Sequence, residues 1–184
     1  MAAVVEKEVK RWTYEDYLLL EDDHRYEILD GELLTAPAPD TYHQRWLRKL
    51  FLKLEDHVTR HKLGEVFFAP LDVVFAADQV TQPDLVFISK ANGSVIQRRG
   101  IFGVPDLLVE IVSPSSARND RYRKKKLYAR FGVKEYWLAD PANETLEILT
   151  LKKGHYELAA CAAQKGKVHS LVLSGLEFDL AEIL

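Results

Sequence analysis

Hydrophobic residues recur along the chain with two different spacings, and each spacing predicts a different kind of element. Between residues 41 and 62, apolar side chains return every three or four positions, which indicates a long amphipathic helix. The same spacing predicts a second helix over residues 117–131, closed by Gly132. A short helix is expected over residues 14–20, with Thr13 as its N-cap.

Short apolar or alternating runs bounded by turn residues predict the strands. Residues 25–29 and 32–35 flank Asp30-Gly31, a dipeptide that favours a two-residue hairpin turn. Five further strands are expected over residues 66–69, 72–76, 85–89, 106–113 and 134–139. Three more, over residues 144–151, 156–162 and 168–173, would form a C-terminal antiparallel meander.

The order of these elements predicts an α/β fold. The helix over residues 117–131 separates the strands 106–113 and 134–139, which is the arrangement of a parallel crossover. A mixed β-sheet flanked by helices follows, in a single domain over residues 1–184, because no segment resembles an interdomain linker. The stretch 90–105 contains three glycines and is expected to be a long mobile loop, a kind of segment that often carries function.

The composition is that of an ordinary soluble globular protein, with 47% apolar and 29% charged residues. The net charge of −3 gives no overall attraction to nucleic acid, so DNA binding would require a local basic patch. Cys161 is the only cysteine, which excludes an internal disulfide and favours a reducing compartment. Residues 1–7 lack an apolar stretch long enough for a signal peptide or a membrane span, so we expect a cytoplasmic protein with no membrane partner.

Two carboxylates stand where burial makes charge costly. Asp84 follows Pro83 and opens an apolar run, and Glu110 lies inside an otherwise apolar strand. A buried carboxylate is strongly unfavourable unless it is paired or holds a metal. Taken singly, Asp84 could begin a strand and Glu110 could pair with a buried basic residue. Together they favour a cation between them, and Mg²⁺, with Mn²⁺ as a substitute, prefers such oxygen ligands.

Lys124 is the third candidate catalytic residue, although two more lysines follow it directly. At 100° per residue, the apolar positions of its helix lie within about 60° of Lys124, whereas Lys125 and Lys126 turn away from them. Asp120 lies one turn earlier on the same face, so an i,i+4 pair that only stabilises the helix is the alternative. The two buried carboxylates favour a catalytic role for Lys124, with Asp120 as an accessory residue.

Two further residues are candidates for the same site. Glu27 shares a strand face with Arg25 and could either complete the metal shell or pair with that arginine. His43 lies about 40° from Leu47 on the helix over residues 41–62, so it could reach the site or simply pack.

Several segments together resemble the Uma-two family of restriction-endonuclease-like proteins, in the PD-(D/E)xK nuclease superfamily. They are RYEILDGEL (25–33), His43, QPDLV (82–86), LVEIVSPS (108–115), Asp120, Lys124, Tyr128 and GVKEYWLADP (132–141). The resemblance implies a restriction-endonuclease-like core whose metal ligands are Glu27, Asp84 and Glu110. It also implies that the catalytic lysine, usually two residues after the acid where Val112 stands here, has moved to Lys124 on the following helix.

These observations predict a Mg²⁺-dependent endonuclease that hydrolyses DNA. The choice of DNA rather than RNA as the substrate rests on the resemblance alone. Contacts to DNA phosphates could come from Arg98 and Arg99 in the stretch 90–105 and from Arg121 and Lys125 on the helix. Such a charge run is more often a solvated helix face. The alternative function is a catalytically inert module on the same fold that binds nucleic acid or protein.

A homodimer is also expected. The C-terminal part of the chain offers apolar edges for a symmetric contact, in the segment VHSLVLS (168–174) and at Leu176, Phe178 and Leu180. A dimer suits either function, because cutting both strands of a duplex can use two sites.

Overall fold

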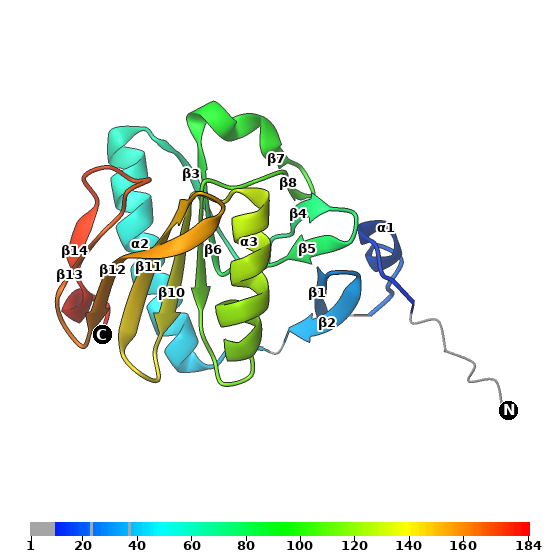
Figure 1. Cartoon of the computed structure of the whole chain (residues 1–184), viewed down its shortest axis with the longest axis horizontal. Helices are drawn as coiled ribbons and strands as arrows, with labels where there is room; N and C mark the ends of the chain where they lie inside the picture. The colour runs from blue at the N-terminus through cyan, green and yellow to red at the C-terminus, as the bar shows by residue number, and fades with distance from the viewer. Residues whose placement is uncertain (1–9, 23, 37) are drawn as a thin grey trace, which may run out of the picture.

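The computed structural model describes residues 10–22, 24–36 and 38–184, whose strands form two six-stranded mixed sheets and one two-stranded sheet (Figure 1). The first sheet, in the order β2-β1-β5-β4-β8-β7, contains β1 (Arg25–Leu29), β2 (Glu32–Ala36), β4 (Val73–Ala76), β5 (Gln79–Thr81), β7 (Ile96–Gln97) and β8 (Gly100–Phe102). The second, in the order β12-β11-β10-β9-β6-β3, contains β3 (Gly64–Phe68), β6 (Leu85–Ser89), β9 (Leu107–Ile111), β10 (Glu135–Asp140), β11 (Thr145–Lys152) and β12 (His155–Ala163). The predicted α/β fold is confirmed, with two mixed sheets in place of the single mixed sheet expected.

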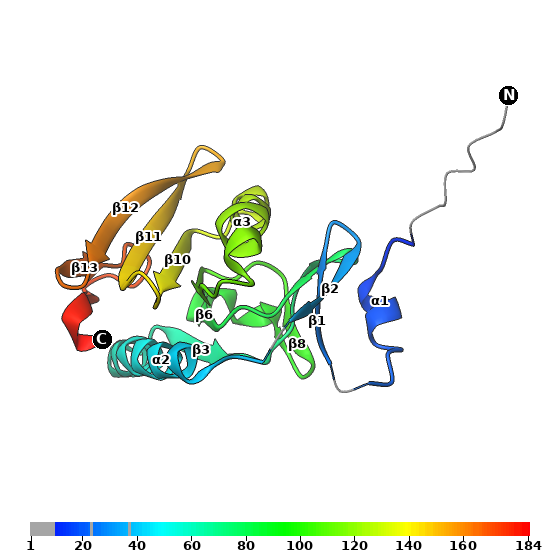
Figure 2. The same ribbon diagram turned by 90° about the horizontal axis from the view of Figure 1, so that it is seen from below.

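Helices cover opposite faces of the second sheet (Figure 2). α2 (Thr41–His61) lies on one face, and the other carries a π-helical turn, η2 (Asn119–Lys124), that continues into α3 (Lys125–Phe131). The remaining helices are short: α1 (Tyr14–Tyr17), η1 (Lys90–Val95) and η3 (Leu180–Glu182). Both long helical predictions are confirmed, while the helix expected over residues 14–20 ends three residues early.

The side chains of β9 alternate between the two faces of the second sheet. Leu107 and Val109 pack in the hydrophobic cluster that contains α2 residues, whereas Leu108 packs in the cluster that contains α3 residues. Successive side chains of a strand point to opposite faces, so Glu110 lies on the α3 face. An acidic residue is thereby placed beneath the helix that carries the lysine run.

The register of β9 with its neighbours brings the second carboxylate to the same place. Antiparallel pairing sets Leu85 of β6 opposite Val109, and continuing this register by one residue sets Asp84 opposite Glu110. On its other side β9 runs parallel to β10, which confirms the predicted crossover. The strand pairing therefore positions both carboxylates.

The predicted hairpin forms, and it carries Glu27 to the same region. Asp30 and Gly31 have φ of 55° and 78°, the left-handed conformation that a two-residue type I′ turn requires. β1 pairs with β2 over its full length, and Leu29 packs in the cluster that contains α3 residues. Glu27 shares a face with Leu29 because the two are separated by one residue.

The stretch 90–105 is not the long mobile loop that the sequence predicts. It contains η1 and the two short strands β7 and β8, and β8 pairs in parallel with β4. One of its three glycines, Gly100, is required by this pairing. A Cβ at Gly100 would lie 2.6 Å from the main-chain oxygen of Asp72, so only glycine permits the close approach of the two strands.

The C-terminal meander also differs from the prediction, because its expected third strand does not join β12. Within residues 168–173 only a short strand forms, β13 (Lys167–His169), and it pairs with β14 (Glu177–Asp179) in a sheet of its own. The apolar residues expected on a free edge, Val168, Leu176, Phe178 and Leu180, are buried in the cluster that contains α2 residues. These four residues complete this chain's own core, whereas Leu171 of the same segment is exposed. The homodimer stays a prediction.

No helix among residues 10–22, 24–36 and 38–184 is both long and apolar enough to cross a membrane. The N-terminal segment, residues 1–7, on which the expectation of no signal peptide rests, lies outside the described residues.

Asp106, directly before β9, joins three elements through a buried carboxylate. Its Oδ2 accepts hydrogen bonds from Ser89 N (2.9 Å) and Asn92 Nδ2 (3.2 Å), and its Oδ1 lies 2.6 Å from Lys134 Nζ. Burial raises the pKa of Asp106, but these donors lower it by more, so the net shift is downward. The ionised carboxylate is therefore favoured in the folded protein.

We expect Asp106→Asn to lower the free energy of unfolding by about 2 kcal/mol at pH 7, since the lost hydrogen bonds involve a charged acceptor. Because the folded-state pKa lies below the unfolded one, the stability from the carboxylate is present above about pH 4 and is lost as the pH falls further. Urea unfolding of both proteins between pH 3 and pH 7 checks this. A difference that stays constant down to pH 3 would contradict the assignment.

Candidate active site

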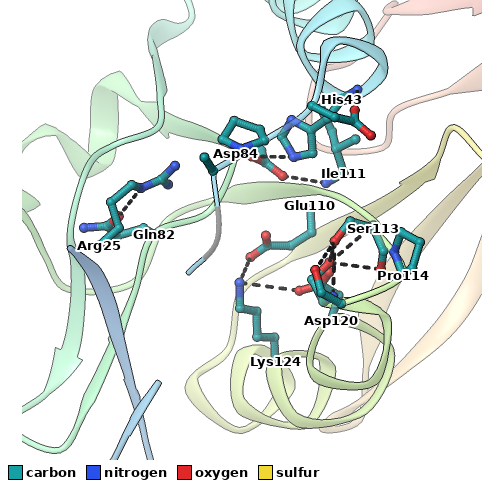
Figure 3. A pocket seen from close by; sticks show the side chains of 15 residues that line it. Arg25, His43, Gln82, Asp84, Glu110, Ile111, Ser113, Pro114, Asp120 and Lys124 are labelled. Atoms are coloured by element: carbon teal, nitrogen blue, oxygen red, sulfur yellow. Dashed lines mark hydrogen bonds and ion pairs between the residues drawn. The ribbon is translucent and has the colours of Figure 1, made fainter. Parts of the chain in front are cut away.

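Five charged side chains from four parts of the chain lie at one end of the second sheet, and Figure 3 labels four of them, Asp84, Glu110, Asp120 and Lys124. They are Glu27 on β1, Asp84 before β6, Glu110 on β9, and Asp120 and Lys124 on η2, and all five are buried. Asp84, Glu110, Asp120 and Lys124 line one cavity of about 300 Å³. The structure thus brings together the three predicted catalytic residues.

Lys124 faces inward and its ammonium contacts three carboxylates. Its Nζ lies 2.8 Å from Glu27 Oε1, 3.1 Å from Glu110 Oε1 and 3.4 Å from Asp120 Oδ1. The helix-face prediction is confirmed for Lys124 and Lys126, which are buried and exposed, whereas Lys125, also expected to face solvent, is half-buried. The i,i+4 contact with Asp120 also forms, but it is the longest of the three.

A π-helical turn presents Asp120 and Lys124 to the sheet. Helical spacing predicts a regular α-helix here, whereas residues 119–124 form the wider turn of η2. Tyr136 of β10 donates a hydrogen bond from its hydroxyl to the main-chain oxygen of Asp120 (3.0 Å), which ties this turn to the sheet. Single π-helical turns inside α-helices occur frequently at functional sites.

Asp84 is held from two sides and is separate from the lysine cluster. Its Oδ2 accepts a hydrogen bond from Ile111 N (2.7 Å), and its Oδ1 lies 3.2 Å from His43 Nε2. His43 therefore reaches the site from the first turn of α2, one of the two outcomes that its helical position allowed. Its other ring nitrogen, Nδ1, is buried without a hydrogen-bond partner among the described residues.

Glu27 is tied to the lysine and to the main chain. Besides Lys124, its Oε1 accepts a hydrogen bond from Gln82 N (2.8 Å). The structure describes no contact between Glu27 and Arg25, the alternative partner. The prediction that Glu27 completes a metal shell stays a prediction.

The site holds more acidic than basic groups. Burial raises the pKa of Glu110 well above its ordinary value, and the neighbouring carboxylates add to the shift while Lys124 opposes it. Burial lowers the pKa of Lys124, but the carboxylates around it raise it by more. Burial also raises the pKa of Asp120, whose Oδ1 has no hydrogen-bond partner among the described residues. One ammonium thus balances several carboxylates.

The donor set suits a hard divalent cation held by few protein ligands. The bonds from Lys124 and from the Tyr128 hydroxyl (2.7 Å) both end on Glu110 Oε1, so Oε2 receives no described bond. Within the described ranges, no three His, Cys, Asp or Glu side chains form a group ready to hold a metal. Mg²⁺ fits the two opposed carboxylates nevertheless, because it keeps several waters and often uses one or two carboxylates plus substrate phosphate.

The four residues predicted to contact DNA lie in two places, and two of them, Arg121 and Lys125, line one cavity beside α3. Arg98 and Arg99 are exposed in the turn between β7 and β8, on the first sheet. Arg121 is bound by Asp140 (2.9 Å) and Glu147 (2.6 Å). Lys125 is half-buried on α3. A role for each of the four in DNA binding stays a prediction.

Comparison with known protein families tests the family resemblance that the sequence motifs indicate. A family model, Uma2, described as "Putative restriction endonuclease", matches residues 14–181. The chain belongs to the Uma2 family. No match is found among the curated proteins.

The Uma2 assignment agrees with a solved structure. A crystal structure from Anabaena variabilis ATCC 29413, described as a "putative nuclease belonging to DUF820", matches with a TM-score of 0.77 and 19% sequence identity. The match covers 93% of this chain and 96% of that chain. At this identity the likeness establishes the fold, and the restriction-endonuclease-like core is confirmed.

Three residues of this Uma2 protein for which no role at the site was predicted also lie there: Arg25, Gln82 and Tyr128. Arg25 lines the cavity and donates from Nε to Gln82 Oε1 (3.1 Å). Tyr128 bonds Glu110 from the same face of the helix as Lys124. Because side chains alternate along a strand, Arg25 lies on the same face as Glu27, and this alternation could have placed the arginine at the site.

Proposed function

We propose that this Uma2 protein is a Mg²⁺-dependent endonuclease that hydrolyses DNA phosphodiester bonds in the cavity lined by Asp84, Glu110 and Lys124. The observation that carries the proposal is that Asp84, directly before β6, and Glu110 on the adjacent strand β9 line one cavity, with the Lys124 ammonium 3.1 Å from Glu110 Oε1. Opposed carboxylates beside a cation are the groups that metal-assisted phosphodiester hydrolysis uses. The family description and the nuclease-like fold support this reaction class.

Asp84 and Glu110 would hold the metal, with Mn²⁺ able to replace Mg²⁺. When bound, the metal would polarise a phosphoryl oxygen and lower the pKa of a coordinated water. Asp84 is oriented for this by the Ile111 main-chain amide and by His43, and Glu110 by Tyr128. These bonds fix the carboxylates before any substrate arrives.

Lys124 would contribute to hydrolysis through the ammonium N–H group that makes the longest of its three contacts. An ammonium has three donors, and two of them point at Glu27 and Glu110 at 2.8 and 3.1 Å. The third faces Asp120 at 3.4 Å, which is long for a hydrogen bond. That donor can turn to a phosphate oxygen and offset the charge that develops on it during hydrolysis.

Cleavage of supercoiled plasmid tests the proposal. We expect nicking and linearisation in Mg²⁺ or Mn²⁺ and none in EDTA. Asp84→Asn keeps an oxygen ligand but loses its charge, so it should need at least about tenfold more Mg²⁺ for the same rate, since even outer-shell changes cost about 10- to 100-fold in metal affinity. The control is Asp56→Asn on α2, an exposed carboxylate paired only with Arg60, and it should behave like wild type.

Cleavage that persists in EDTA would contradict the metal requirement, and an unchanged Mg²⁺ requirement in Asp84→Asn would remove Asp84 from the site. A second candidate function is an inert module that binds nucleic acid. It is favoured by the present engagement of Lys124 with three carboxylates, which leaves no ammonium donor wholly free. DNA binding by wild type without cleavage in either metal would favour this second function.

A further inference from the structure

We propose that Arg25 binds the DNA phosphate group that occupies the cavity, and that Gln82 holds its guanidinium in place for this. The inference rests on the proposed function and adds a substrate contact to it. Arg25 lies on β1 and lines the same cavity as Asp84 and Glu110. Figure 3 shows Arg25 and Gln82 on one side of this cavity and Glu110, Asp120 and Lys124 on the other.

The guanidinium of Arg25 is fixed at one end. Its Nε donates to Gln82 Oε1 (3.1 Å), and Gln82 Nε2 donates in turn to Asp72 Oδ1 (2.9 Å). Gln82 is buried, and its main-chain amide bonds Glu27. A chain of hydrogen bonds thus sets the position of the Arg25 Nε. No described contact uses the two terminal nitrogens, which are the pair that grips phosphate oxygens.

Charge in the cavity points to the same residue. Lys124 is surrounded by three carboxylates, and the His43 ring is bound to Asp84. Among the described residues, Arg25 is therefore the cation lining the cavity that has no carboxylate partner. A phosphodiester entering a cavity with excess acidic groups needs such a cation, because the carboxylates alone would repel it.

The alternative is that Arg25 only links β1 to the segment before β6 through Gln82. The two roles predict different effects of replacing Arg25. A purely structural arginine would affect the folding of the protein. A phosphate-binding arginine would affect the salt dependence of DNA binding and the rate of cleavage, because each phosphate neutralised by the protein releases counterions from DNA.

The test compares Arg25→Gln and Arg25→Lys with the control Arg60→Gln. The control removes the same charge from an exposed ion pair on α2. Binding of each protein to a fluorescent duplex is measured in EDTA at several KCl concentrations. We expect Arg25→Gln to reduce the slope of log K against log[KCl] by about 0.9, the value for one phosphate contact, while Arg25→Lys and the control keep the wild-type slope.

Cleavage in Mg²⁺ gives the second measurement. Arg25→Gln should lower kcat/KM by about 10- to 100-fold, the size of a lost charge-assisted hydrogen bond. Arg25→Lys should also cleave more slowly, since it keeps the charge without the two-pronged donor. A circular-dichroism unfolding curve establishes that each variant is folded at the assay temperature, and Arg25→Lys carries the test if Arg25→Gln is not.

The outcomes separate this inference from the proposed function. A wild-type slope and a wild-type rate in both Arg25 variants would overturn the inference while leaving the nuclease proposal intact. DNA binding by wild type without cleavage would overturn the nuclease proposal. The slope of log K against log[KCl] in Arg25→Gln would still decide whether Arg25 binds a phosphate. The absence of both DNA binding and Mg²⁺-dependent cleavage by wild type would overturn both.

Discussion

Lys124→Met is expected to lower the rate of Mg²⁺-dependent DNA cleavage by about 10³-fold. Methionine keeps the length and the apolar stem of the buried side chain but removes the ammonium that lies 3.1 Å from Glu110 Oε1. No other described cation contacts the carboxyl group of Glu110, so nothing nearby replaces its charge. Single-turnover cleavage of plasmid at saturating Mg²⁺ measures the effect on the chemical step.

The same substitution should lower stability, because it leaves Glu27, Glu110 and Asp120 together without a cation. Removing one partner from a buried ion cluster costs about 3–5 kcal/mol. Adding Glu27→Gln removes one of the negative charges and should recover part of the lost stability, but not the cleavage. Mn²⁺ affinity, measured by titration calorimetry, should not fall in Lys124→Met, since the substitution removes a positive charge and no oxygen ligand.

Lys126→Met is the matched control, because Lys126 lies on the same helix and is exposed. It should keep the wild-type rate within about twofold, since surface substitutions of this kind change little. Wild-type cleavage by Lys124→Met would make the lysine a structural residue of the site. A folded double variant with Glu27→Gln that cleaves normally would lead to the same conclusion.

The sequence predicts those features of the site that depend on local periodicity. Asp30-Gly31 specifies a turn that demands left-handed backbone, and the observed φ values meet that demand. Helical spacing indicates which of three consecutive lysines faces the core. The position of Glu110 in an apolar strand indicates a buried carboxylate with a partner, and the structure supplies Lys124.

Features that depend on contacts between distant segments are beyond such reasoning. Arg121 belongs to the same basic run as Lys125, yet Asp140 and Glu147 from β10 and β11 bind it. The strands β8 and β4 are also far apart in the sequence. The glycine-containing stretch 90–105 therefore resembles a loop as long as the strand with which it pairs is unknown. The hydrogen bond from Gln82 N to Glu27 likewise exists only because β1 and the segment before β6 meet in space.

Glu135→Gln is expected to lower the free energy of unfolding by about 3 kcal/mol. Glu135 on β10 is fully buried, and each of its carboxylate oxygens accepts two hydrogen bonds. Oε1 accepts from Trp137 Nε1 (2.7 Å) and Ser170 Oγ (2.6 Å), and Oε2 from the main-chain amides of Leu171 (2.7 Å) and Val172 (3.1 Å). The carboxylate thus fastens the C-terminal segment to the second sheet.

An amide nitrogen cannot accept a hydrogen bond, so glutamine at position 135 leaves unsatisfied either the two main-chain amides or, since the Ser170 hydroxyl can turn to accept, the Trp137 N–H. At least one buried donor left unsatisfied, together with the lost charge on the acceptor of the remaining bonds, costs about 3 kcal/mol, which for a protein of this size lowers Tm by about 10 °C. The control is Glu157→Gln on β12, the same chemical change at an exposed pair with Lys152, where the effect should stay within about 0.5 kcal/mol. Calorimetric melting of the three proteins decides the matter. A loss below 1 kcal/mol in Glu135→Gln would mean that the C-terminal segment is held by its apolar residues rather than by this carboxylate.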